Sequence, residues 1–288
     1  MDILFSGTGT KLQIGNSASS IDFTPWADVL HRGWHEGVPE NTLPAYYLIG
    51  RNGYCWGECD VRLTADKQIV LCHDSTVTGK RNGVSTTLTV AESTAEEITS
   101  LVLQTHGTYG DIHPCTLAQL LELAKTVNLS ILIDVKSAGN MMQEEGNRIL
   151  AQTVMASGWA DHVVYMPLGI NAAKWIQAVD KNASFDFVTS IYESGKETFL
   201  SNLSAYRELL TGANTVGFDL NASAWGGDDV IDAIHNAGLN VSFWGVNNTS
   251  FFAKNPLRVT YSGYANAKLG NQHLLNQRSA LAAKYPTV

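Results

Sequence analysis

Short apolar runs recur along this chain between residues 29 and 246, and segments long enough for helices separate most of them. Such runs predict strands, and strands that alternate with helices predict a parallel sheet covered by helices. Eight runs favour a closed barrel over an open sheet, so the expected fold class is an α/β TIM (β/α)8 barrel. The predicted strands are residues 29–31, 57–63, 69–73, 130–136, 162–166, 185–191, 215–220 and 240–246. The predicted helices are residues 42–51, 117–127, 141–157, 171–180, 196–210 and 228–237.

Two connections depart from this alternation. Only residues 64–68 join the second and third predicted strands, and a long polar stretch, residues 75–114, follows the third. Long loops inside compact domains are usually functional or mobile, so residues 75–114 are expected to form an insertion with little regular structure, as a lid or small subdomain. The expected organisation is an N-terminal arm over residues 1–26 and a barrel domain over residues 27–288.

Composition limits the partners. The 288 residues carry a net charge of -8, which argues against a nucleic-acid partner because phosphate backbones need a basic face. A small phosphodiester needs only one or two placed cations. The four cysteines lack zinc-finger spacing and are expected to be reduced thiols. No apolar run reaches about 18 residues and no leader opens the chain, so we expect no transmembrane segment and a cytoplasmic location, or an extracellular one if a longer protein is involved.

Charged and polar side chains gather at the ends of the first four predicted strands, where barrel active sites are built. Residues i and i+2 of a strand face the same side, so Glu58 and Asp60 point together, and Asp134 does so with Lys136. Carboxylates that face a barrel interior are costly unless they are paired or bind a cation. Glu58, Asp60 and Asp134 therefore predict a site for one divalent ion, Ca²⁺ or Mg²⁺, although Asp134 and Lys136 pairing with each other is the alternative.

Three other strand ends carry candidates for catalysis and substrate binding. His31 and His73 come from separate strands and are expected to flank the substrate as acid and base. Arg32, like Lys136, supplies positive charge for a phosphate. Trp244 on the last predicted strand is a candidate substrate contact through its ring, with a buried core residue as the equally weighted alternative.

The order of these motifs resembles one known family. His31-Arg32-Gly33, Pro39-Glu40-Asn41-Thr42, Glu58-x-Asp60-Val61 and His73-Asp74 look like the signature of glycerophosphodiester phosphodiesterases, and the similarity covers residues 29–247. The resemblance implies a barrel with one divalent metal held by Glu58, Asp60 and Asp134, and His31 and His73 as the acid/base pair. It implies that Arg32 and Lys136 hold phosphate oxygens, and that Glu40 supports its neighbours at the barrel mouth.

The sequence departs from the family pattern at two positions and in its tail after Asn255, which lacks the usual family ending of an Asp followed closely by Pro. Asp134 stands where the family usually has Glu, and Gly245 stands where Thr is common. The resemblance implies hydrolysis of a glycerophosphodiester to an alcohol and glycerol phosphate. The substrate is expected to be a small glycerophosphodiester or a glycerol-phosphate polymer. A phospholipase-like enzyme of the same superfamily, or a teichoic-acid-directed module of a larger surface or phage protein, stays open. The oligomeric state is not predicted.

Overall fold

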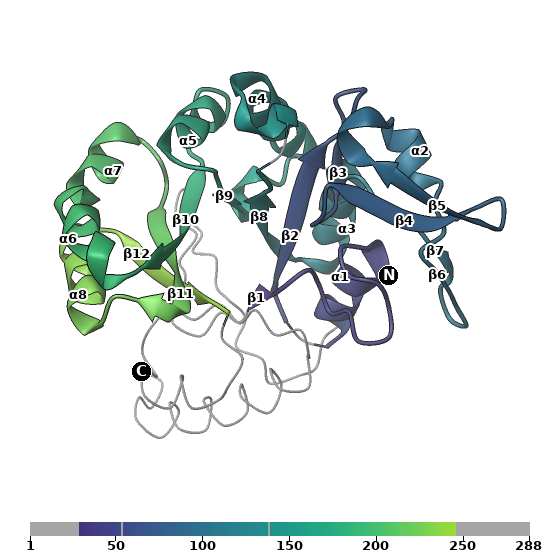
Figure 1. The fold of residues 1–288 in the computed structure, drawn as a ribbon, viewed down its shortest axis with the longest axis horizontal. Coiled ribbons are helices and arrows are strands. Elements are labelled where there is room, and N and C mark those ends of the chain that lie inside the picture. The colour runs from purple at the N-terminus through teal and green to yellow at the C-terminus, as the bar shows by residue number, and fades with distance from the viewer. Residues whose placement is uncertain (1–28, 53, 138, 246–288) are drawn as a thin grey trace.

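A curved sheet forms the centre of the protein (Figure 1). The computed structural model describes residues 29–52, 54–137 and 139–245. Seven strands of the sheet follow one another in parallel, in the order β1-β2-β8-β9-β10-β11-β12. Their bounds are β1 (Val29–Leu30), β2 (Trp56–Leu63), β8 (Ser130–Val135), β9 (Val163–Met166), β10 (Ser184–Ile191), β11 (Val216–Trp225) and β12 (Asn240–Trp244). The curl of this parallel sheet and the helices on its outer side are those of a TIM-type α/β barrel, so the predicted fold class is confirmed.

The third predicted strand is present but has a different place in the sheet. β3 (Ile69–Leu71) pairs antiparallel with β2, and Leu63 lies opposite Ile69. The connection of five residues explains this pairing, because a parallel neighbour needs a crossover of a dozen or more residues. The strand is therefore the second half of a hairpin, and β2 pairs directly with β8 on its other edge. Counting residues 69–73 among the parallel barrel strands was wrong.

Helices cover the outer face of the sheet (Figure 1). They are α1 (Leu43–Arg51), α3 (Leu117–Val127), α4 (Glu144–Ser157), α5 (Ile170–Gln177), α6 (Glu193–Ser201), α7 (Leu203–Leu209) and α8 (Asp228–Asn236), with short 3-10 turns η2 (Gly139–Met142) and η3 (Ala160–His162). The helix predicted over residues 196–210 is two helices, which meet at Asn202. A capping box between Thr116 and Gln119 starts α3. No helix in the described part of the chain is long and apolar enough to cross a membrane.

Strand alternation divides the side chains between two apolar layers. Cys59 and Val61 of β2 pack outward with the helices in the main core, whereas Trp56 of the same strand joins a smaller cluster on the inner side. That inner cluster also contains Val29, Leu132, Val164 and Met166. Glu58 and Asp60 lie on the same strand face as Trp56, so these carboxylates point into the barrel above an apolar floor. The polar site therefore lies beside a cluster of apolar side chains inside the barrel.

The polar stretch after β3 has more regular structure than expected. It contains the hairpin β4 (Thr76–Arg81) and β5 (Val84–Thr89), the turn η1 (Val90–Glu92), α2 (Ala95–Thr99), and a second hairpin of β6 (Gln104–His106) and β7 (Gly110–Ile112). Val77, Val90, Ile98 and Leu101 form a small core beneath it together with Val70. The expectation of little regular structure was wrong because this core is small and the hairpin strands are mostly polar. The arm predicted over residues 1–26 lies outside the described residues.

Candidate functional site

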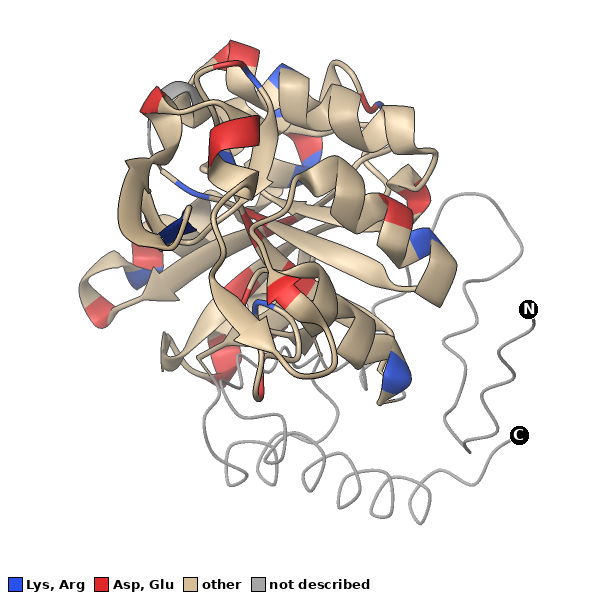
Figure 2. Ribbon diagram, turned by 90° about the vertical axis from the view of Figure 1, so that its right-hand side faces the viewer, with Lys and Arg blue, Asp and Glu red and all other residues tan. Residues whose placement is uncertain are grey.

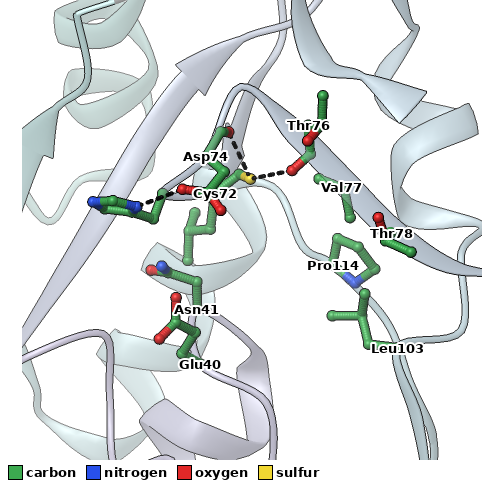
Figure 3. A pocket seen from close by; sticks show the side chains of 11 residues that line it. Glu40, Asn41, Cys72, Asp74, Thr76, Val77, Thr78, Leu103 and Pro114 are labelled. Carbon is green, nitrogen blue, oxygen red and sulfur yellow. Dashed lines mark hydrogen bonds and ion pairs between the residues drawn. The ribbon is translucent and has the colours of Figure 1, made fainter. Parts of the chain in front are cut away.

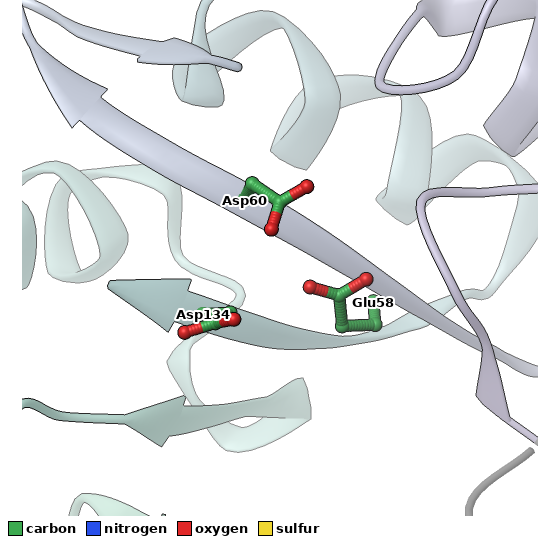
Figure 4. A group of neighbouring side chains, drawn as sticks. All are labelled: Glu58, Asp60 and Asp134. Carbon is green, nitrogen blue, oxygen red and sulfur yellow. The ribbon is translucent and has the colours of Figure 1, made fainter. Parts of the chain in front are cut away.

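Three carboxylates meet where β2 and β8 run side by side (Figure 4). Asp60 lies opposite Asp134 in the strand register, and Glu58 precedes Asp60 by two residues on the same face. One oxygen from each of the three side chains lies within 4.8 Å of the others. Glu58 and Asp60 are buried, and Asp134 is half-buried. The register of two parallel strands thus brings together the three residues that the sequence predicted as metal ligands.

Two cations contact this carboxylate cluster. Lys136 places Nζ 2.7 Å from Asp60 Oδ1 and 2.5 Å from Asp134 Oδ2. Arg32 places Nε 3.2 Å from Asp60 Oδ2, and its Nη1 donates to Glu40 Oε1 at 2.8 Å. The mutual pairing of Asp134 and Lys136 is therefore present, and it coexists with the grouping of the carboxylates. Glu40 holds the outer end of the Arg32 guanidinium.

The donor set fits a hard divalent cation. All three groups offer carboxylate oxygens, which Ca²⁺ and Mg²⁺ prefer. Burial, and then the charges of Asp60 and Asp134, hold the pKa of Glu58 well above its usual range. This environment penalises the charge on Glu58, and a bound divalent ion would remove that penalty. Glu58, Asp60 and Asp134 are the residues that would hold such an ion.

Hydrogen bonds with the uncharged side chain of Asn41 hold Asp60 in place. Asn41 donates from Nδ2 to Asp60 Oδ2 at 2.7 Å, and its Oδ1 accepts from the Asp60 amide at 3.2 Å and from the Tyr46 hydroxyl at 2.9 Å. Asn41 has a left-handed backbone with φ of 54°, which Asn tolerates better than most residues. The sequence motif contained Asn41, but its role was missed because its partner lies 19 residues away.

The two histidines border the same cluster just after the ends of β1 and β3. Burial, and then the charge of Arg32, lower the pKa of His31 to about 4, so its ring is neutral near pH 7. His73 Nδ1 lies 2.8 Å from Asp74 Oδ1. The Arg62 guanidinium donates from Nε to the His73 carbonyl at 3.0 Å. Sequence reasoning missed Arg62, a positioning contact that depends on the hairpin between β2 and β3.

Both histidines interact electrostatically with the carboxylate cluster. The charges of Asp60 and Lys136 act on the pKa of His31, and the charge of His73 acts on that of Asp134. Trp244 is partly buried, packs against the inner apolar cluster and donates from Nε1 to the Thr189 carbonyl at 3.4 Å. The contacts of Trp244 are those of a barrel-lining residue, and its role as a substrate contact stays a prediction.

A second buried acidic group lies on β10, β11 and β12 and was not predicted. Ser242 Oγ lies 2.5 Å from Asp186 Oδ2 and 3.1 Å from Asp219 Oδ1. Asp186 Oδ1 and Asp219 Oδ2 are buried without a hydrogen-bond partner. Burial raises the pKa of Asp186 to about 7, and burial and then the charge of Asp186 raise the pKa of Asp219 well above its usual range. One hydroxyl proton cannot serve two carboxylates, so this group needs at least one further proton.

Together, the fold and the site define a class of protein. It is an α/β barrel with a cluster of carboxylates that could hold a cation, bordered by two histidines at the carboxyl ends of the strands. The family model described as "Glycerophosphoryl diester phosphodiesterase family" matches residues 31–274. The chain belongs to this family, so the resemblance inferred from the sequence is confirmed.

Individual relatives agree with the family assignment. A protein of Mycobacterium tuberculosis named "Probable glycerophosphodiester phosphodiesterase 1" is 35% identical over 111 residues, which are 34% of this chain and 40% of that protein. The chain therefore aligns with about two fifths of the length of this curated relative.

Solved structures show the same fold over a larger part of the chain. A putative glycerophosphoryl diester phosphodiesterase from Silicibacter pomeroyi has a TM-score of 0.70 and 18% identity, and covers 90% of this chain and 95% of its own. A phosphodiesterase from Oleispira antarctica, solved with the product sn-glycerol-3-phosphate, has a TM-score of 0.68 and 19% identity, and covers 87% and 97%.

Proposed function

We propose that this chain hydrolyses glycerophosphodiesters to an alcohol and glycerol phosphate with the help of one divalent cation. The observation that carries the proposal is the set of three carboxylate oxygens within 4.8 Å of one another, bordered by His31 and His73. The family assignment and the product complex of the Oleispira antarctica phosphodiesterase support it. The ion is Ca²⁺ or Mg²⁺ in this proposal, because both prefer oxygen ligands.

The two histidines have different environments, which support different roles. His31 is neutral near pH 7, since its pKa is lowered to about 4, and a neutral imidazole accepts the proton of the attacking hydroxyl. His73 has Nδ1 directed to Asp74, so Nε2 is the nitrogen left to donate a proton to the leaving alkoxide. The nucleophile is water or a neighbouring hydroxyl of the substrate.

The charges beside the carboxylates support binding of one phosphate. When bound, the cation supplies electrostatic stabilisation for the charge that develops on the phosphoryl oxygens. Arg32 and Lys136 lie at the edge of the cluster and neutralise the remaining phosphate charge, while Glu40 keeps the guanidinium in place. Asp134 stands where the family usually has the longer Glu, and it is half-buried whereas Glu58 and Asp60 are buried, so we expect it to be the weakest of the three ligands.

A small substrate fits the charge distribution better than a nucleic acid. The net charge is -8, and Lys and Arg positions are scattered among Asp and Glu positions over the ribbon in Figure 2. A polyanion needs a continuous basic track, whereas one phosphate needs the two cations at the cluster. A glycerol-phosphate polymer is also compatible, because only one repeat has to reach the cluster.

The test is a phosphodiesterase assay on glycerophosphodiesters, teichoic-acid fragments and a single-stranded oligonucleotide, with and without Mg²⁺ or Ca²⁺. Turnover should require metal and should be lost in Glu58→Gln. The matched control is Glu122→Gln, which removes an exposed carboxylate of α3 and should keep wild-type turnover. Metal-independent turnover, or an oligonucleotide that is cleaved faster than every glycerol diester, contradicts the proposal.

One observation favours a second candidate, a phospholipase-like activity on lysolipids. Four exposed apolar side chains lie on β10 or in the segments that follow β8, β9 and β10: Met142 in η2 at 60% exposure, Leu168 after β9 and Val188 on β10 at 42%, and Tyr192 after β10 at 63%. Exposed apolar groups near a barrel mouth suit an acyl chain. Faster turnover of a long-chain lysophospholipid than of its deacylated glycerol diester would establish this candidate over the first.

A further inference from the structure

A cavity of about 180 Å³ lies between the barrel and the insertion (Figure 3). The barrel side contributes Glu40, Asn41 and His73, and the insertion contributes Thr76 and Thr78 of β4. The floor is apolar, with Leu71, Val77, Leu103 and Pro114. The cavity thus connects one of the two histidines to the part of the chain that is added to the barrel.

We propose that this cavity binds the leaving alcohol of the substrate, and that the alcohol it fits best is a short primary amino alcohol of the ethanolamine type. The inference rests on the proposed function, because it needs a phosphodiester held at the carboxylate cluster. It adds the identity of the alcohol and the residues that select it, Thr76 and Thr78.

The position of His73 relates the cavity to the leaving group. A general acid must lie within hydrogen-bond reach of the oxygen that it protonates. His73 lines the cavity and keeps Nδ1 on Asp74, so an alcohol oxygen that receives the proton from Nε2 has its carbon chain in the cavity. Pockets for drug-sized ligands measure about 300–1,000 Å³. The smaller volume here suits one end of a diester and leaves the glycerol phosphate at the cluster.

Apart from the general acid His73, the polar groups of the cavity are mainly acceptors. Glu40 and Asp74 contribute carboxylates, Thr76 and Thr78 contribute hydroxyls, and none of the described lining residues is Lys or Arg. Arg32 offsets the charge of Glu40, and His73 offsets that of Asp74, whose side chain is 78% exposed, as long as the ring carries both protons. Once His73 gives its Nε2 proton to the leaving alkoxide, the charge of Asp74 is no longer offset and attracts a cation. Cys72 adds no charge, because burial raises the pKa of its thiol to about 11. The cavity therefore favours a cationic alcohol over a neutral or anionic one.

The lining also discriminates between kinds of cation. Quaternary ammonium groups are recognised by aromatic cages, and His73 supplies the one aromatic ring among the described lining residues. A primary ammonium carries three N–H donors, which match the carboxylate and hydroxyl oxygens of the cavity. This difference favours ethanolamine over choline as the leaving alcohol.

The experiment changes the charge of the cavity at Thr78. Thr78→Lys and Thr78→Glu are assayed for kcat/KM on glycerophosphoethanolamine, glycerophosphocholine and glycerophosphoglycerol with metal present. Thr78 is an exposed residue of a hairpin outside the carboxylate cluster. The matched controls are Thr108→Lys and Thr108→Glu, which make the same changes at an exposed insertion residue that does not line the cavity.

The ratio of kcat/KM for glycerophosphoethanolamine to that for glycerophosphoglycerol should fall on the order of tenfold in Thr78→Lys, and should rise in Thr78→Glu. The Thr108 variants should keep the wild-type ratio. Damage to folding would move both Thr78 variants in the same direction and both substrates together, so it cannot imitate this pattern.

The inference is overturned if wild-type enzyme hydrolyses the diesters but the ratio is the same in both Thr78 variants, or if glycerophosphocholine is the better amino-alcohol substrate. Absence of turnover on all glycerol diesters overturns the proposed function as well, so the two failures are distinguishable.

Discussion

The buried group formed by Asp186, Asp219 and Ser242 predicts an unusual dependence of stability on pH. Asp186 has a pKa of about 7 in the folded chain, compared with 3.8 for an unperturbed Asp. Between these two values the folded state holds a proton that the unfolded state has released. Unfolding therefore releases a proton in this window, and the free energy of unfolding falls as the pH rises from about 4 to about 7.

The magnitude follows from the difference between the two pKa values. A difference from 3.8 to about 7 corresponds to about 4 kcal/mol. About 3 kcal/mol of this loss falls between pH 5 and pH 8, where most proteins are studied. That loss is large beside the 5–15 kcal/mol that typically separates folded from unfolded states.

Asp186→Asn should remove this contribution. Asn has nearly the same shape and cannot ionise, so the difference in unfolding free energy between wild type and variant should change by about 3 kcal/mol between pH 5 and pH 8. The variant becomes relatively more stable as the pH rises. The measurement is urea unfolding followed by circular dichroism at several pH values in a chelating buffer.

Comparison of the two proteins cancels the titrations of groups outside the pair, whereas Asp219 belongs to the pair, because the charge of Asp186 raises its pKa. The lowered pKa of His31 makes stability rise with pH between about 4 and 6.5 in both proteins, so it does not affect the difference. Asp232→Asn, at an exposed residue of α8, should show the wild-type pH dependence. Parallel stability curves for wild type and Asp186→Asn would refute the reasoning, because they would show that Asp186 holds no extra proton in the folded state.

Three further outcomes are expected. His31→Ala and His73→Ala should each lower kcat by about 10²–10⁴-fold at unchanged melting temperature, and a variant that keeps wild-type turnover removes that histidine from the mechanism. Chelation should abolish turnover and added Mg²⁺ or Ca²⁺ should restore it, with a higher metal concentration needed by Asp134→Asn; full activity after dialysis against chelator contradicts this. Asn41→Ala should cost about 1–3 kcal/mol in urea unfolding because the buried Asp60 loses a donor to its carboxylate and an acceptor for its amide, and an unchanged midpoint argues against that network.

The main elements of the fold could be predicted because local patterns encode them. All eight apolar runs are strands in the structure, and most predicted helices begin and end within a few residues of their predicted limits. The orientation of β3 was not predicted because an apolar run does not specify whether its neighbour is parallel or antiparallel. The length of the preceding connection contained that information, since five residues allow a hairpin and not a crossover.

The candidate site could be predicted in part for the same reason. Alternation along a strand placed Glu58 beside Asp60, and the third predicted ligand, Asp134, lies opposite Asp60 on the adjacent strand. The contacts of Asn41 and Arg62 could not be predicted, because they join residues from different elements. Asp186 and Asp219 were overlooked although each interrupts a buried apolar strand, a pattern that is costly for a charge and could have marked both residues.

The pairing of β2 with β8 has an evolutionary consequence. The chain leaves the barrel after Leu63 and returns at Ser130, yet the two strands on either side of this excursion are hydrogen-bonded neighbours. The insertion, residues 75–114, can therefore be lengthened, shortened or replaced without a change in the number or order of the parallel strands and without loss of His73, because loop length affects closure entropy only slowly. Glu58, Asp60 and Asp134 lie on the strands and would remain in register. Descendants of such a chain can acquire new preferences for the departing alcohol by exchanging one peripheral module while the hydrolytic chemistry is inherited intact.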